Sequence, residues 1–71
     1  MPVKQLLTDI ENSIEKNNYD RIRFKTTNHQ YFAVPEDVSY VSRYFFRILT
    51  ATGEVIVNIN QLEFVELFNS E

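Results

Sequence analysis

The chain of 71 residues contains no cysteine and no tryptophan, and it has only one histidine, one glycine and two prolines. Without cysteine there is no disulfide framework, thiolate metal site or cysteine nucleophile, and this absence favours a reducing, cytoplasmic compartment. A single glycine cannot supply the glycine-rich loops that cradle nucleotide phosphates. The single histidine, His29, lies in a polar stretch and has no second histidine or cysteine with which to bind a metal ion. The sequence therefore predicts neither a metal nor a cofactor.

Long apolar runs are also missing. No stretch approaches the roughly 20 apolar residues that span a bilayer, and the apolar run at the N-terminus is too short for a secretory signal, so we expect no contact with a membrane. The composition, 44% hydrophobic and 24% charged, is that of a folded chain. At this length it forms one domain over residues 1–71. Its small core leaves little volume for an enzyme pocket, so we expect no catalysis.

The spacing of apolar residues predicts one helix followed by strands. Five apolar residues recur at helical spacing and predict an amphipathic helix over residues 3–17: Val3, Leu6, Leu7, Ile10 and Ile14. Beyond residue 20 the period falls to two. This change predicts strands over 21–26 and 31–34, a loop with one helical turn at 35–37, a long central strand over 40–50, a tight hairpin at Gly53, and strands over 55–60 and 62–68.

These elements predict an α+β fold, in which an N-terminal amphipathic helix precedes a four- to five-stranded antiparallel sheet. The short connections leave no room for parallel crossovers. The sheet lies open against the helix or closes into a small barrel. The strand at 40–50 carries aromatic residues on both faces, but a sheet packed against one helix buries only one face. Burial of the aromatic residues on the second face requires either barrel closure or a partner.

Charge is distributed unevenly along the chain. Residues 20–50 hold five cations and three anions, whereas residues 51–71 hold four anions and no cation, within a net charge of −3. Every arginine lies in the middle segment, among tyrosines and phenylalanines. Arginine and aromatic residues are enriched in protein interfaces, and the same mixture binds single-stranded nucleic acids.

The leading functional hypothesis is a small, non-enzymatic protein-interaction or regulatory module. Alternation places Phe45 on one face of the strand at 40–50, flanked by Arg43 and Arg47, and these three are the predicted partner-binding residues. The partner is a second copy of the chain or another protein. The abundance of Asn, Ile, Glu and Lys is typical of AT-rich bacterial or phage genomes.

The alternative hypothesis is binding of single-stranded RNA or DNA by an oligomer. Its predicted residues are three cations that share one strand face and two nearby tyrosines: Arg21, Arg23, Lys25, Tyr31 and Tyr44. The net negative charge counts against this function, because affinity for nucleic acid comes mainly from neutralising phosphates. A third interpretation assigns the cations to ion pairs with Glu54, Glu63 or Glu66 on neighbouring strands.

The C-terminal third resembles a known family. Residues 55–67 form a β-branched strand, a short polar turn and an aliphatic-x-aromatic-aliphatic-acidic strand, an ending similar to that of the Sm-like (LSm) small barrels and of other SH3-like barrels. The resemblance covers under a third of the chain, and the first turn, Asn28-His29-Gln30, has no glycine where Sm-like domains usually carry one. The resemblance implies a ring-shaped homo-oligomer that binds single-stranded RNA.

Overall fold

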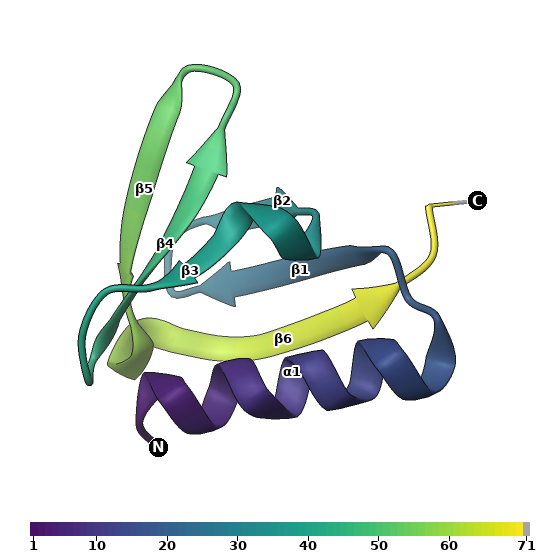
Figure 1. Cartoon of the computed structure of the whole chain (residues 1–71). Helices are drawn as coiled ribbons and strands as arrows, with labels where there is room; N and C mark the ends of the chain where they lie inside the picture. Colours follow the sequence, from purple (N-terminus) through teal and green to yellow (C-terminus); the bar gives the residue numbers. More distant parts are fainter. Residues whose placement is uncertain (71) are drawn as a thin grey trace.

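The computed structural model describes residues 1–70 and consists of one α-helix, six strands and two 3-10 turns (Figure 1). In chain order the elements are α1 (Val3–Asn17), β1 (Arg21–Thr26), β2 (Gln30–Ala33), η1 (Pro35–Asp37), β3 (Val38–Tyr40), β4 (Phe45–Thr50), β5 (Gly53–Asn58), η2 (Ile59–Gln61) and β6 (Leu62–Phe68). The predicted α+β class is confirmed.

Helix α1 has the predicted bounds, and local chemistry explains both ends. Pro2 precedes the first turn, where its missing N–H removes no helical hydrogen bond. At the other end Asn18 adopts a left-handed conformation with φ of 58°, and its N–H donates to the Ile14 carbonyl at 2.7 Å. Val3 and Ile10 of the apolar stripe are buried.

The strands form two antiparallel sheets of three strands, rather than the single sheet expected from the sequence. The first sheet has the order β2-β1-β6 and the second has the order β3-β4-β5. Within residues 1–70 no strand pairing joins the two sheets, so they do not close into a barrel. The prediction of one sheet was wrong because the period of two fixes which face a side chain occupies, but not which strands pair.

The chain crosses between the sheets at the two 3-10 turns. It leaves β2 through η1, where Pro35 has no N–H to continue a ladder and the Asp37 N–H donates to the Val34 carbonyl at 3.0 Å. It returns through η2, where the Asn58 side-chain oxygen accepts from the Asn60 N–H at 2.9 Å. The predicted helical turn at residues 35–37 is confirmed.

The strand predicted over residues 40–50 is shorter and divided. β3 ends at Tyr40 and β4 begins at Phe45, with a turn between them, and the longest strand is β6, with seven residues. β4 is central in its sheet, as predicted. Gly53, with φ of 156°, begins β5 directly after the two-residue turn that closes the β4–β5 hairpin.

The core lies between the inner faces of the two sheets. Phe24 of β1 and Phe46 of β4 are fully buried, and their rings are tilted against each other with centroids 5.0 Å apart. Ile22 and Ile48 extend this layer, and α1 contributes Val3. Because the core occupies the inner faces, both outer faces are left for solvent or a partner. The β4–β5 hairpin projects beyond the rest of the fold (Figure 1).

Candidate interaction surfaces

The outer face of the second sheet, here called the β4 face, carries three exposed apolar side chains. Register pairs Phe45 with Asn58, Arg47 with Ile56 and Leu49 with Glu54, and these six residues define the face. Phe45 is 39% exposed, Leu49 45% and Ile56 46%. Ile56 lies opposite Arg47, and therefore diagonally across from both Phe45 and Leu49. The three apolar side chains thus form one apolar strip over two strands.

An ion pair lies at the centre of the β4 face. Arg47 Nε is 3.2 Å from Glu54 Oε1. The same Nε atom is buried and forms no hydrogen bond within residues 1–70, so the contact with Glu54 is a charge interaction without hydrogen-bond geometry. A partner that covers this face therefore contacts an apolar strip together with Arg47, whose positive charge is balanced by Glu54.

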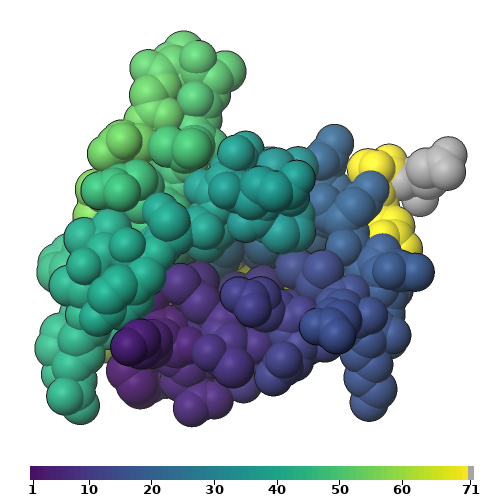
Figure 2. Space-filling view, in the orientation of Figure 1, coloured from purple at the N-terminus to yellow at the C-terminus, as the bar shows by residue number. Residues whose placement is uncertain are grey.

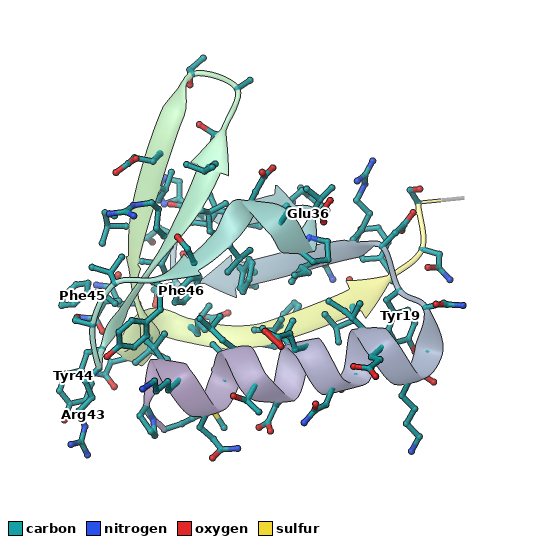
Figure 3. The ribbon with its side chains drawn as sticks, viewed as in Figure 1. Tyr19, Glu36, Arg43, Tyr44, Phe45 and Phe46 are labelled. Carbon is teal, nitrogen blue, oxygen red and sulfur yellow. The ribbon has the colours of Figure 1, made fainter. Side chains whose placement is uncertain are left out.

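The three predicted partner-binding residues are only partly brought together. Phe45 and Arg47 share the β4 face, whereas Arg43 lies before β4, in the turn that follows β3. Its guanidinium is 5.6 Å from the ring of Tyr44, and its carbonyl accepts from the Val3 N–H at 2.9 Å. Figure 3 shows Arg43 and Tyr44 at one corner of the molecule, with Phe46 turned toward the interior. Strand alternation cannot place Arg43, because the strand begins only at Phe45.

The outer face of the first sheet, here called the β1 face, combines cations and phenylalanines. Its cations are Arg21, Arg23 and Lys25 on β1, as predicted. Register places Phe32 of β2 and Glu66 of β6 on either side of Arg23, with Phe64 opposite Lys25 and Phe68 opposite Arg21. Phe32 is 59% exposed and Phe64 45%. The rings of Phe32 and Phe68 meet edge to face at 6.3 Å.

Two of the three cations on the β1 face are paired with glutamates. Arg23 donates to Glu66 at 2.8 Å and to the Gln30 side-chain oxygen at 3.2 Å, and its guanidinium lies 5.1 Å from the Phe64 ring. Lys25 Nζ is 3.6 Å from Glu63. Arg21 forms no ion pair among the described residues. The expectation of cross-strand ion pairs is confirmed for Arg23 and Lys25, while Glu54 pairs with Arg47 instead.

The five predicted nucleic-acid-binding residues do not form one surface. Tyr31 is opposite Phe24 in the β1–β2 ladder and packs against the core, on the face opposite to the three cations. Its ring stacks on His29 with centroids 6.1 Å apart. Tyr44 belongs to the turn before β4 in the other sheet.

The aromatic rings beside the cations are phenylalanines that our sequence interpretation missed. Phe64 and Phe68 stand at even spacing in the last strand, on the face that Glu66 also occupies, and this alternation is visible in the sequence. Phe32 follows from the same rule, since it alternates with the inward-facing Tyr31. Only the pairing of β1 with β2 and β6 shows that these rings surround Arg23.

A groove of about 540 Å³ separates β2 from the projecting hairpin. Arg21 and Phe32 line one side and Leu49 lines the other, with Asp37 nearby. The groove therefore links the β1 face to the apolar strip of the β4 face. It is open to solvent and is lined by both an acidic and a basic group.

The lone histidine and the acidic side chains form no metal centre in the part of the chain that is described. His29 lies in the β1–β2 turn, where its backbone carbonyl accepts from Thr26. No group of three or more histidine, aspartate or glutamate side chains within residues 1–70 is arranged to hold a metal ion. No helix in this range has the length and apolar character needed to cross a membrane.

Comparisons with models of protein families, with curated proteins and with solved structures gave no match. Function must therefore be inferred from the two outer faces, their exposed apolar residues and their ion pairs.

Proposed function

We propose that this chain is a small, non-enzymatic protein-interaction module that docks through the β4 face. The single observation that carries the proposal is the apolar strip of Phe45, Leu49 and Ile56, three large side chains between 39% and 46% exposed on adjacent strands. Contiguous exposed apolar side chains are a common feature of protein interaction sites.

The charge of the β4 face supports a protein partner over a nucleic acid. Arg47 is balanced by Glu54, so the strip presents no surplus of positive charge to phosphates. The face combines an aromatic residue, Phe45, with an arginine, Arg47, and both are residue types enriched among those that contribute most binding energy in protein interfaces. Arg43 and Tyr44, in the adjoining turn, extend the surface at its rim.

The experiment compares two double variants in affinity capture from a bacterial lysate. Phe45→Ala with Leu49→Ala removes two side chains of the strip and keeps the Arg47–Glu54 pair. Loss of hot-spot residues costs about 2 kcal/mol or more, so we expect affinity for the captured protein to fall at least about thirtyfold. The matched control, Phe32→Ala with Phe64→Ala, removes two comparably exposed rings from the β1 face. Circular dichroism shows whether both variants remain folded.

The proposal predicts that the native chain and the control variant capture the same protein and that the Phe45→Ala, Leu49→Ala variant does not. Capture of the same proteins by both variants, or loss only in the β1-face variant, contradicts it.

Single-stranded nucleic acid is the second candidate, because the β1 face places three cations beside Phe32, Phe64 and Phe68. Rings under bases and cations on phosphates are the usual components of such a surface. The ion pairs of Arg23 and Lys25 leave Arg21 as the cation of this face without a carboxylate partner in the described residues. Binding of mixed oligonucleotides that weakens steeply with salt, and that is lost in the Phe32→Ala, Phe64→Ala variant, favours this candidate.

A further inference from the structure

Strand β5 is an open sheet edge without the features that usually block edge pairing. It is the terminal strand of the second sheet, it has six residues, and its pairing with β4 has no bulge. Natural edges are blunted by short length, bulges, proline or charged residues, lysine above all. β5 has no proline and no lysine, and Glu54 is its only charged residue. It is therefore a template for a further strand.

The backbone groups that face this open edge follow from the hairpin. A two-residue turn closes on a hydrogen-bonded pair, here Thr50 and Gly53. The pattern alternates along the ladder, and the Ile59 N–H donating to the Tyr44 carbonyl at 2.8 Å continues it at the far end. The N–H and C=O groups of Val55 and Val57 thus face β4. Those of Glu54 and Ile56 face outward.

The tip of the hairpin that carries this edge stands clear of the domain, whereas Ile56 and Val57 lie near the β1–β2 turn. Every residue from 49 to 54 is exposed. Figure 2 shows the green tip of the hairpin rising beyond the remaining surface. An isolated two-stranded hairpin is only marginally stable, and a third strand along its edge supplies the missing hydrogen bonds and apolar contact.

The other strands at sheet edges are poorer templates. β2 has four residues and β3 has three. β6 carries two charged residues, Glu63 and Glu66, and charged residues on an edge strand oppose pairing.

We propose that two copies of this chain associate by antiparallel pairing of their β5 strands about a two-fold axis near Val55 and Ile56. The strand is self-complementary in this arrangement. With the axis at Val55, each Glu54 lies opposite Ile56 of the second copy, and with the axis at Ile56 it lies opposite Asn58. Like charges do not meet in either case, and β-branched residues face each other across the axis.

Pairing would join the two second sheets into one six-stranded sheet. The β4 faces of the copies would then form a single wider surface, and in this respect the inference deepens the proposed function. The edge contact itself uses backbone groups and does not require that function to be correct.

The first test measures solution mass by light scattering over a wide range of concentration. We expect twice the 8.4 kDa of one chain. Ile56→Pro removes an outward-facing N–H without removing a hydrogen bond to β4, so it is expected to give the single-chain mass. The matched control, Ile56→Thr, keeps the N–H and the β-branched shape and is expected to retain the dimer. Circular dichroism verifies the fold of each.

If Ile56→Pro does not fold, Ile56→Lys takes its place, because a charged residue on an edge strand opposes pairing. Its matched control is Leu49→Lys, which puts the same charge on the same face but on the central strand β4. We expect loss of the dimer for Ile56→Lys and a retained dimer for Leu49→Lys.

The second test uses the absence of cysteine in the chain. Single variants Val55→Cys and Ile56→Cys are oxidised mildly, with Leu49→Cys as the control. The proposal predicts a covalent dimer from position 55 or 56 in high yield and little from position 49, because residues on the two-fold axis bring their β-carbons within disulfide reach.

A single-chain mass for the native protein, or an assembly that survives both Ile56→Pro and Ile56→Lys, overturns the inference. Its failure is distinguishable from failure of the proposed function. Phe45→Ala with Leu49→Ala leaves the outward-facing backbone groups of β5 in place and so retains a β5 dimer, while it loses the captured protein. If the native protein is a dimer but the Phe45→Ala, Leu49→Ala variant still captures the same protein, only the proposed function is refuted. If the native protein has the single-chain mass and this variant loses the captured protein, only the dimer is refuted.

Discussion

Replacing Phe46 by alanine is expected to destabilise the fold far more than the same replacement at the adjacent Phe45. The two side chains point to opposite faces of β4. Phe46 is fully buried and its ring lies 5.0 Å from that of Phe24, whereas Phe45 is 39% exposed on the β4 face. The comparison changes the same residue type in the same strand, so β propensity is matched and the difference reports burial.

The expected magnitudes follow from that burial. Truncation of a fully buried phenylalanine costs about 3 to 5 kcal/mol. The loss has two parts, the transfer free energy of the removed atoms and the free energy of the cavity that they leave. Complete burial of a phenylalanine contributes about 1.5 to 3 kcal/mol, so the partly covered Phe45 should cost roughly 1 to 2 kcal/mol. A domain of this length has a free energy of unfolding of about 4 to 11 kcal/mol. Phe45→Ala therefore stays folded, and Phe46→Ala loses a large part of its stability.

Urea unfolding monitored by far-ultraviolet circular dichroism measures both values. If Phe46→Ala is unfolded without urea, the comparison is made with Phe46→Leu and Phe45→Leu instead. Phe46→Leu removes three buried side-chain carbons at about 0.8 kcal/mol each, whereas Phe45→Leu should change the free energy of unfolding much less. Equal destabilisation at the two positions, or a larger loss at Phe45, would refute the assignment of the inner and outer faces of β4.

Two further predictions concern local interactions. Asn18 holds φ of 58° at the end of α1, so Asn18→Gly should keep or slightly raise the melting temperature. Asn18→Ala should cost about 1 kcal/mol, because alanine lacks the short polar side chain that lets asparagine adopt this conformation. Thermal unfolding that ranks alanine above glycine would contradict the capping role. The Arg23–Glu66 pair at 2.8 Å joins a half-buried arginine to an exposed glutamate, so a double-mutant cycle should give a coupling of about 0.2 to 1 kcal/mol that falls with added salt. A larger coupling that is insensitive to salt would show that the pair is shielded from solvent.

The local structure was largely predictable from the sequence. The helix over residues 3–17, the strand at residues 21–26, the 3-10 turn at residues 35–37 and the hairpin before Gly53 each depend on a spacing or on a residue with restricted backbone geometry. Such signals act over a few neighbouring residues. They can therefore be recognised without knowledge of the rest of the fold.

The candidate site was only partly predictable. Phe45 and Arg47 share a face because they are two residues apart in one strand, and the period of two suffices to show it. The same rule failed for Arg43, since a turn interrupts the strand before it. The contribution of Ile56 and Leu49 to one apolar strip depends on the register of β4 against β5, which side-chain alternation leaves open.

Composition and residue spacing are enough to establish the α+β class, to exclude disulfides and thiolate sites, and to predict the alternation of buried and exposed residues along each strand. Strand pairing had to be known before the two sheets, the inward position of Tyr31, the three phenylalanines around Arg23 and the open edge of β5 could be recognised. Pairing brings together residues that are far apart in the chain. The free energy of those contacts depends on every strand at once, so no local pattern records it.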